Sequence, residues 1–503
     1  MSTRLKTNTA LASNTRLKPG QRSAHPKPFR DEKPVAPFHR GVLQLDRPMF
    51  LRQLCTDEYT PRPYSATDLR VVRRTQDMLG GIARDRGVPV TALAGERTAT
   101  AAGLQALNAE YGDTFYHVPD SATMGEDEAR EFFDGDELII DVQTHYMAPH
   151  SMSLFPCDWL RQLLGSVAPP WWRDLDEAHA WDLSYYLTNV YLRTDTTVAV
   201  LTSSPGTTDL CPLFNDEIHA TRTLVDNLAG SGRLLNHAVV HAEMDAQREA
   251  MTEMAERYDP VGWKVYTMGA MLETGWSDPW RLDDERTGLP FLARCRELGK
   301  KLICTHKGLS QFAQNGDPYD VGPAAVAFPD IDFVVYHSGF EFPVDGAPEE
   351  GAFTEETKDV GCNRLITTLL DNGIGHGSNV YAELGSTWYS TVRNPVAAAH
   401  VLGKLIKHIG VDNVIWGTDS VWYGGGQPLI DALRTFQIPD RMCEEFGYEK
   451  ITAEDKEKIF GLNAAKVYNV NVDAAKHAAK NDDLAWCREA VDEYRKKQFP
   501  GVR

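Results

Sequence analysis

Five apolar stretches of the sequence each end on a residue that can bind a metal or transfer a proton. Four of them end on histidine and the fifth ends on aspartate. Imidazole nitrogens and carboxylate oxygens are common ligands of zinc, manganese and iron, and both groups also act as general acids and bases. Their recurrence at the ends of similar stretches predicts one active site that uses metal or acid–base chemistry. The five residues are His145, His241, His306, His337 and Asp419.

The stretches that carry these residues have the length and composition of buried strands. There are eight such stretches, and segments of mostly helical character separate most of them, which is typical of parallel βαβ units. Eight such units close into a (β/α)8 TIM barrel, an α/β fold whose chemistry takes place at the carboxyl ends of the strands. The stretches are residues 137–145, 196–203, 233–241, 261–267, 301–306, 331–337, 379–384 and 413–419.

The sequence around these strand ends resembles the amidohydrolase superfamily, and within it the branch called amidohydrolase 2. The resemblance runs from about residue 137 to about residue 470 and rests on the order and spacing of several motifs. It implies a metal-dependent TIM-barrel hydrolase or a related decarboxylase. The motifs are Asp141-Val-Gln-Thr-His145, Thr305-His306-Lys307-Gly308, Tyr336-His337-Ser338-Gly339, Trp416-Gly417-Thr418-Asp419-Ser420 and Ile459-Phe-Gly-Leu-Asn463-Ala-Ala465.

The resemblance implies that His145, His306 and Asp419 are metal ligands. Asp419 would also take a proton from metal-bound water, because a divalent metal can lower the pKa of that water to about 7. His337 would bind a second metal or, in members with one metal, polarise or protonate the substrate. The structural alternatives are hydrogen-bonded histidines in the barrel core and, for Asp419, a cap for the following helix.

Gln143 is the main departure from the family pattern. Alternate residues of a strand share a face, so Asp141, Gln143 and His145 are expected to point the same way. The family usually has histidine at the position of Gln143, although its branch tolerates other residues there. An amide carbonyl is a neutral and weaker ligand than imidazole. Gln143 could therefore bind the metal, orient metal-bound water, or do neither.

Lys264 lies near the end of the fourth predicted strand, where members of the family with two metals can carry a carbamylated lysine. Because Gln143 replaces a histidine ligand, a second metal site would have too few ligands. We therefore expect one metal and an unmodified Lys264. Its ammonium group would then attract an anionic group of the substrate. A lysine paired with Glu383 or Asp141 is the alternative. Weaker candidates for polar site residues are His241, Glu341 and Arg364.

The chain is expected to contain four segments. Residues 1–45 are basic and contain several prolines, which predicts a flexible arm. Residues 46–135 form a helical extension, with helices at about 65–86 and 91–111, that covers the barrel or builds a dimer contact. Residues 136–475 form the barrel. Residues 476–503 form a charged helix with Trp486 as its docking point.

Two long insertions leave the carboxyl ends of strands and are rich in tryptophan. They either pack against the barrel or form an aromatic lid over an apolar or aromatic substrate. A glycine-rich run at residues 423–427 follows the eighth strand and could approach a ligand through its backbone, but it is not a nucleotide fingerprint. The tryptophans are Trp159, Trp171, Trp172, Trp181, Trp276 and Trp280.

The charge, hydrophobicity and cysteine content of the sequence limit which partners and compartments we expect. The 503 residues carry a net charge of −19, which argues against non-specific nucleic-acid binding. No apolar run is long enough for a membrane span, and no secretory signal is evident. The eight cysteines show neither metal-binding nor disulfide-framework spacing, so we expect reduced thiols. These features predict a cytoplasmic enzyme with a small-molecule substrate, assembled as a homo-oligomer.

The preferred function is hydrolysis of an amide, ester, lactone or activated carbon–carbon bond with the help of a divalent metal. Zinc is the first choice for two histidines and a carboxylate, followed by manganese or iron. Decarboxylation of an aromatic or unsaturated acid is the alternative. The third alternative is a barrel without catalytic activity that serves as a binding or assembly subunit. It is considered because Gln143 replaces the histidine that the family usually has.

Overall fold

The computed structural model of the protein describes residue 44 and residues 46–53, 64–148, 150, 181–207, 211–272, 275–309, 313–341 and 350–498. The predicted arm, apart from Gln44, lies outside the described residues. Trp159, Trp171 and Trp172 of the first long insertion also lie outside them.

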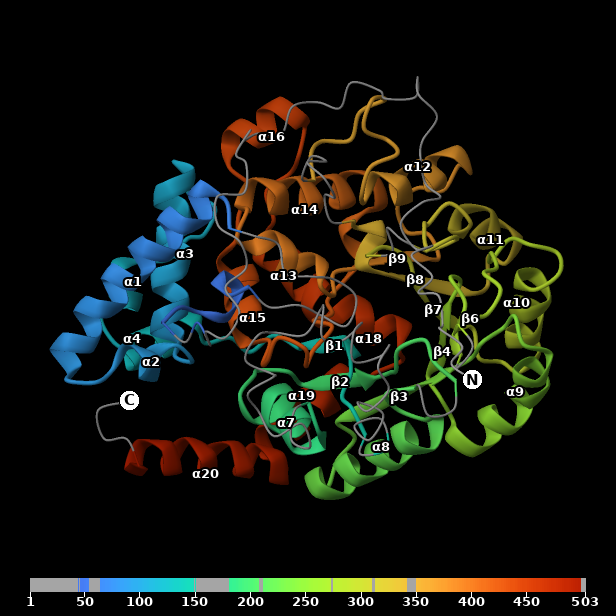
Figure 1. The fold of residues 1–503 in the computed structure, drawn as a ribbon, viewed down its shortest axis with the longest axis horizontal. Helices are drawn as coiled ribbons and strands as arrows, with labels where there is room; N and C mark the ends of the chain where they lie inside the picture. Colours follow the sequence, from blue (N-terminus) through green and yellow to red (C-terminus); the bar gives the residue numbers. More distant parts are fainter. Residues whose placement is uncertain are drawn as a thin grey trace, which may run out of the picture.

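Eight parallel strands form the centre of the molecule, and each lies within one of the predicted stretches. They pair in chain order and are surrounded by helices, which confirms the predicted TIM barrel (Figure 1). The strands are β1 (Ile140–Thr144), β2 (Val198–Leu201), β3 (Leu234–Val239), β4 (Gly262–Tyr266), β7 (Leu302–His306), β8 (Asp332–Tyr336), β9 (Val380–Glu383) and β10 (Val414–Ile415). The short pair β5 (Met271–Leu272) and β6 (Gly275–Trp276) lies in the loop after β4.

Helices connect the strands in the order expected of the fold. Between β1 and β2, α7 (Leu183–Leu187) continues into a π-helical turn, η6 (Thr188–Leu192). The later helices are α8 (Asn215–Ala229), α9 (Asp245–Tyr258), α10 (Gly288–Glu297), α11 (Val321–Ala327), α12 (Asn363–Asp371), α13 (Thr387–Val392), α14 (Pro395–Ile409), α15 (Gln427–Thr435) and α16 (Asp440–Phe446).

Backbone hydrogen bonds join the end of β1 to the segment after β10 and complete the barrel. The amide of Asp419 donates to the carbonyl of Gln143 at 2.9 Å, and the amide of His145 donates to the carbonyl of Ser420 at 2.6 Å. Because of this pairing, the predicted metal ligands of the first strand lie directly beside Asp419.

The amino-terminal end of the barrel is closed by the helical run α17 (Ala453–Glu457), η10 (Lys458–Leu462) and α18 (Asn463–Val467). Ala464 and Ala465 pack into the barrel interior with the strand residues. Gly461 lies so close to Leu138 that an added Cβ would meet its carbonyl oxygen at 2.2 Å, so only glycine fits there. The last motif of the sequence therefore has a structural role.

The helical extension packs against the barrel. It contains α1 (Ala66–Arg86), α2 (Val90–Leu93), α3 (Arg97–Tyr111) and α4 (Glu126–Phe133). Tyr116, which follows α3, donates its hydroxyl to the carbonyl of Val392 at 2.7 Å, and its ring lies 5.5 Å from that of Phe436. The extension thus covers the side of the barrel, while its predicted dimer contact stays a prediction.

The prediction of one helix over residues 91–111 is wrong, because the chain breaks between α2 and α3. Glu96 has extended backbone angles there, and its carboxylate accepts hydrogen bonds from Arg86 at 2.6 and 3.0 Å. The ion pair with α1 holds Glu96 outside a helix. By contrast, α1 begins as predicted, with Ser65 and Asp68 forming a capping box.

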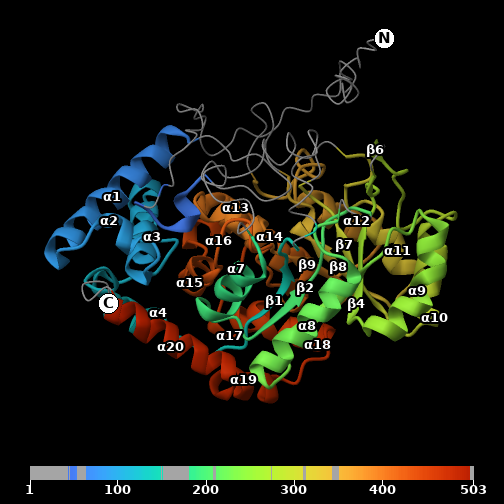
Figure 2. The ribbon, with the colours of Figure 1, turned by 60° about the horizontal axis from the view of Figure 1, so that its bottom comes forward.

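Two helices, α19 (Val472–Asn481) and α20 (Asp483–Gln498), end the described chain. Trp486 was predicted to dock the last helix, but it is 66% exposed, whereas Leu484 is buried. Ion pairs of Arg488 with Asp195 and of Arg130 with Asp492 hold α20 instead. The helix therefore lies next to α4 of the extension, as Figures 1 and 2 show.

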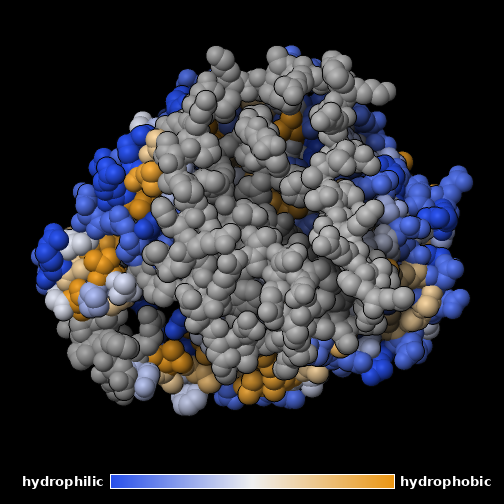
Figure 3. Space-filling model, viewed as in Figure 1, coloured by the Kyte–Doolittle hydropathy of each residue, from blue (hydrophilic) through white to orange (hydrophobic). Residues whose placement is uncertain are grey.

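On the face shown in Figure 3, the coloured surface is mainly hydrophilic, with hydrophobic residues along the lower edge over α8 and α20. In the described part of the chain, none of the helices combines the length and the apolar character that a membrane crossing requires. All six described cysteines are free thiols.

Candidate active site

All six predicted site residues are buried, and they come from five strand segments at the same end of the barrel. Gln143 lies in β1, Lys264 in β4 and His306 at the end of β7. His145 and His337 directly follow β1 and β8, and Asp419 lies four residues after the end of β10. The residues are Gln143, His145, Lys264, His306, His337 and Asp419.

Asp419 is the centre of a hydrogen-bonded group. Its Oδ1 accepts a hydrogen bond from Nε2 of Gln143 at 2.8 Å and lies 3.2 Å from Nε2 of His145. Its Oδ2 accepts a hydrogen bond from the hydroxyl of Ser386 at 2.6 Å. Burial raises the pKa of Asp419 to about 6, and the charge of His337 and the hydrogen bond from Ser386 limit the rise. A carboxylate with this pKa is suited to accept a proton near neutral pH.

The first strand does not follow simple alternation over its whole length. Its register with β2 shifts between Asp141 and Thr144. Gln143 and His145 both contact Asp419, as expected, but the carboxylate of Asp141 accepts hydrogen bonds from the amide and hydroxyl of Thr418 at 2.9 and 2.5 Å. Asp141 thus braces the segment before Asp419 instead of contacting Asp419 itself.

His337 is fixed by the neighbouring strand. Its Nδ1 lies 2.7 Å from the carbonyl oxygen of Gly385, and its amide donates to Oε2 of Glu383 at 3.0 Å. A carbonyl can only accept, so Nδ1 carries the proton of this bond and Nε2 is the nitrogen that can take up another.

His306 lies against His337, with the ring centroids 4.7 Å apart and the rings nearly perpendicular. Burial lowers the pKa of His306 well below its usual value, and the charges of His337 and Lys264 lower it further. His306 is therefore a neutral imidazole at neutral pH, which is the form that binds a metal.

Three site residues have left-handed backbone angles. The φ values are 66° at His337, 54° at Ser386 and 62° at Asp419. Residues other than glycine rarely adopt this region, and strained backbone of this kind clusters at active sites. Here the strained residues lie within four residues of the carboxyl ends of β8, β9 and β10.

Lys264 is fully buried in an aromatic environment. Its Nζ lies 3.6 Å from the ring centroid of Tyr336 and 4.6 Å from that of Tyr266. Cation–π contacts of this length stabilise a charged ammonium away from water. The charge of Lys264 also lowers the pKa of Asp419, so the two groups influence each other electrostatically.

The weaker candidates have local partners. Nε2 of His241 lies 2.9 Å from the carbonyl oxygen of Gly206. Glu341 and Arg364 form an ion pair with each other at 2.7 Å, and Arg364 also donates to the carbonyl of Gly339. These contacts give each of the three residues a structural role.

Glu383, Ser386 and Trp422 also belong to the site. Sequence reasoning named Glu383 only as an alternative partner of Lys264 and gave the other two no role. Burial raises the pKa of Glu383 to about 7, and its carboxylate accepts the amides of His337 and Gly385. The ring of Trp422 stacks on His145 with 5.7 Å between centroids. The only sequence signal for Glu383 was a polar residue within the seventh apolar stretch.

Among the three insertion tryptophans that the structure describes, Trp181 reaches the site. The ring of Trp181 meets that of Trp422 edge to face at 5.2 Å, and both residues are buried. Trp280 instead packs against Phe291 at 5.9 Å, and Trp276 is 50% exposed. Trp181 and Trp422 therefore form an aromatic wall beside His145, while Trp280 has the packing role that was the alternative.

The predicted ligand atoms are of the chemical types that bind a divalent metal. The set offers two imidazoles, one carboxylate and the Oε1 atom of Gln143, which is buried and has no hydrogen-bond partner among the described residues. Within the same residues, however, no three His, Cys, Asp or Glu side chains are gathered closely enough to hold an ion. A metal would therefore have to draw His145, His306 and Asp419 together from their present positions.

Replacing Ser386 with alanine should move the acid limb of the pH–rate profile to higher pH by about one unit. The Ser386 hydroxyl stabilises the ionised form of Asp419, so its removal raises the pKa further. A base must be ionised to act, and activity is therefore lost at a higher pH. Ser390→Ala is the matched control, because Ser390 donates to the carbonyl of Ser386 and leaves Asp419 untouched. An unshifted limb in Ser386→Ala would mean that Asp419 is not the titrating base.

Comparison with known proteins gives one family match. A family model described as amidohydrolase matches residues 140–470. None of the curated proteins matches the chain.

Several solved structures are similar to the barrel at low sequence identity. An uncharacterized TIM-barrel protein from Bordetella bronchiseptica is 15% identical, with a TM-score of 0.41 over 66% of this chain and 98% of that chain. A dihydroxybenzoic acid decarboxylase from Polaromonas, with bound manganese and 2-nitroresorcinol, is 13% identical, with a TM-score of 0.39 over 67% and 98%. A dihydropyrimidinase from Brevibacillus agri is 15% identical, with a TM-score of 0.34 over 66% and 71%.

Proposed function

Because the chain belongs to the amidohydrolase family, whose model matches residues 140–470, we propose that it is a metal-dependent hydrolase of a small aromatic or apolar substrate. The observation that carries the proposal is the buried carboxylate of Asp419 at the end of the last strand. It is oriented by Gln143, His145 and Ser386, and its pKa is about 6. The aromatic wall of Trp181 and Trp422 supports the choice of substrate.

Asp419 acts as the general base in this proposal. Its Oδ1 and Oδ2 are held by neighbouring side chains, so the carboxylate is positioned before a substrate arrives. It takes a proton from the attacking water, and His337 carries a proton at Nε2 to the leaving group. Lys264 favours substrates with an anionic group, because its buried positive charge acts through a medium of low dielectric constant.

The proposed metal site consists of His145, His306, Asp419 and the carbonyl of Gln143. A divalent metal bound there would polarise the scissile bond and make water more acidic. Zinc is the proposed ion because two imidazoles and one carboxylate are a common zinc set, and manganese or iron would also suit these ligands. The neutral state of His306 supports its role as a ligand.

Decarboxylation of an aromatic acid is the second candidate, favoured by the proximity of the Lys264 charge to the site and by the aromatic wall. The two reactions are distinguished by incubating the protein with an aryl amide or ester and with an aryl carboxylate in oxygen-18 water. Incorporation of oxygen-18 into the product supports hydrolysis. Release of carbon dioxide without that incorporation would replace the proposed function by a carboxy-lyase activity.

His145→Ala and His306→Ala should each lower metal content and activity together. Each variant removes one of only a few ligands, so the affinity of the remaining set falls. Elemental analysis after dialysis against a chelator measures the content. Full metal occupancy in both variants would place the metal elsewhere. A wild-type protein that takes up no stoichiometric metal would support the inactive barrel instead.

Gln143→Ala should have a smaller effect on metal binding than the two histidine variants. A weak inner-sphere or outer-sphere partner costs about 10–100-fold in metal affinity when removed, so binding should weaken without disappearing. Gln143→His should increase resistance to the chelator, because imidazole is the stronger ligand. Unchanged resistance would show that this side chain does not face the metal.

A further inference from the structure

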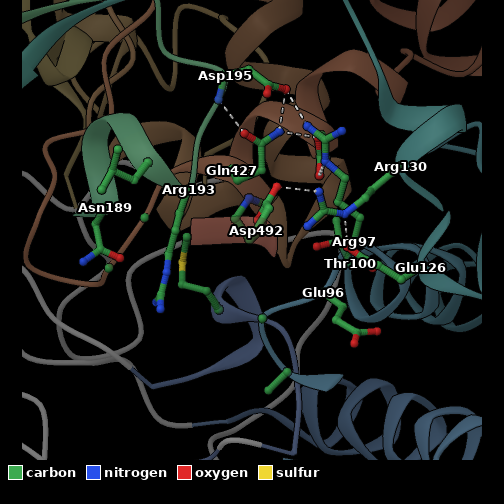
Figure 4. Close-up of a pocket in the computed structure, with 18 of the residues that line it drawn as sticks. Glu96, Arg97, Thr100, Glu126, Arg130, Asn189, Arg193, Asp195, Gln427 and Asp492 are labelled. Carbon is green, nitrogen blue, oxygen red and sulfur yellow. Dashed lines mark hydrogen bonds and ion pairs between the residues drawn. The ribbon is translucent and has the colours of Figure 1, made fainter. Parts of the chain in front are cut away.

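A second cavity lies outside the barrel, between its last strand loop and the helical extension. Its volume is about 650 Å³, within the range of small-molecule sites. Its walls come from the segment around Met49 and Arg52, the break between α2 and α3, α4, the run of α7 and η6, the glycine-rich run after β10, and α20. Figure 4 shows Asn189 and Arg193 on one side and Glu96, Glu126 and Arg130 on the other. None of the six predicted site residues lines it.

Most charged groups of this cavity have partners of opposite charge. Glu126 is paired with Arg130, and Asp492 is paired with the same arginine. Asp195 is paired with Arg97 and Arg488. These pairs form the wall and hold the extension and α20 to the barrel.

Arg52 is the exception. Its Nε donates to the carbonyl of Arg47 at 3.1 Å, and one terminal nitrogen lies 3.5 Å from the carbonyl of Ala94. Among the described residues, no carboxylate forms an ion pair with it. Burial lowers the pKa of Arg52, which shows that its charge is poorly solvated. A guanidinium left without a counter-charge at the wall of a cavity is a site for an anion.

Two further groups that suit an anion lie near Arg52. Tyr185 and Arg193 line the same cavity as Arg52, and the positive charges of the two arginines oppose the rise that burial causes in the pKa of the Tyr185 phenol. The backbone of Gly424 follows the same wall, and an added Cβ would lie 3.6 Å from the Tyr185 hydroxyl. Two arginines and one tyrosine thus belong to the lining of one cavity.

We propose that this cavity binds a small organic anion through Arg52, Arg193 and Tyr185. The recognised group is a carboxylate or a phosphate, because arginine binds both in the same bidentate way. Glu131 and Asp134 line the α4 side of the cavity, so the rest of the ligand is uncharged or cationic.

The bound anion would be connected to the active site through two tyrosines. The hydroxyl of Tyr389 donates to the carbonyl of Arg52 at 3.3 Å, and its ring stacks on Tyr423 at 4.4 Å. Tyr389 lies on α13, three residues after Ser386, and Tyr423 lies four residues after Asp419. Occupation of the cavity would therefore stiffen the two segments that hold the catalytic carboxylate.

The test is calorimetric titration of the full chain with sodium phosphate and with sodium succinate, each against sodium chloride at equal ionic strength. We expect saturable binding of at least one of the two anions and none of chloride. The anion that binds identifies the recognised group. Arg52→Gln should weaken binding about tenfold or more, since it removes hydrogen bonds to a charged group. The absence of saturable binding of both anions to the wild-type protein would overturn the proposal.

Arg193→Gln is the second variant, because its exposed side chain can be replaced without disturbing the fold. It should weaken binding in the same direction, and it decides the question if Arg52→Gln does not fold. Arg74→Gln is the matched control, since it removes one positive charge from an exposed pair with Glu110 on the far side of the extension. Equal affinity in Arg52→Gln, Arg193→Gln and the wild type, or equal weakening in Arg74→Gln, would overturn the proposal.

Discussion

Replacing Asp419 with asparagine is expected to reduce turnover by roughly 10³-fold or more. An amide has nearly the shape of the carboxylate but cannot accept the proton of the attacking water. It also contributes no negative charge to a metal. Because the position still fits between Gln143 and Ser386, the variant should keep its fold.

The measurement is kcat/KM on the substrate identified by the oxygen-18 experiment, together with thermal unfolding and metal content. Asp141→Asn is the matched control, since Asp141 is equally buried and its carboxylate braces Thr418. We expect a smaller loss of activity there. A near-wild-type rate in Asp419→Asn, with metal content unchanged, would remove Asp419 from the mechanism.

Replacing Asp195 with asparagine should lower the free energy of unfolding by up to about 3–5 kcal/mol, the effect of removing one partner from a fully buried ionic group, because the Asp195 side chain is only 17% exposed. Asp195 forms ion pairs with Arg97 of the extension, Arg434 of α15 and Arg488 of α20. It also accepts a hydrogen bond from Gln427 at 2.9 Å. The variant would leave three neighbouring guanidinium groups without this carboxylate.

The pH dependence of stability gives this prediction a second readout. Burial acts to raise the pKa of Asp195, but the charges of Arg97, Arg434 and Arg488 outweigh it and hold the pKa well below the usual value. A group of this kind stabilises the fold above its unfolded pKa, near 4, and the contribution is lost as the pH falls below that value. Asp195→Asn should lack this acid-dependent loss.

Chemical denaturation at neutral pH and at low pH measures both effects. Asp245→Asn is the control, because Asp245 pairs with Arg248 on the surface and is 83% exposed, so its loss should cost little. Equal stability of Asp195→Asn and the wild type would show that the extension and α20 are held by apolar packing alone.

The barrel could be predicted from the sequence because its signal is local. A stretch of apolar residues bounded by helical segments specifies a buried strand by itself, and all eight stretches contain one. The position of Asp419 beside Gln143 and His145 followed from the same logic, since the ends of the first and last strands must meet in a closed barrel.

The errors arose where a distant residue decides the local structure. The break before α3 depends on the ion pair of Glu96 with Arg86, which no periodicity records. Trp486 looks like an anchor by its type, but Leu484 and Arg488 hold the helix. Ser386 acquires its role only through a left-handed backbone and a carboxylate on another strand.

The ionic group at Asp195 has a consequence for how the protein is made. Its partners lie at residues 97, 434 and 488, so it joins segments that are far apart in the sequence and are synthesised at different times. The edge of β1 likewise has no neighbour on one side until β10 has been translated. A nascent chain that stalls in between exposes an open sheet edge, which invites aggregation. The barrel edge is therefore closed only after the segment behind β10 has been synthesised, and the Asp195 group is complete only after Arg488 of α20 has been added.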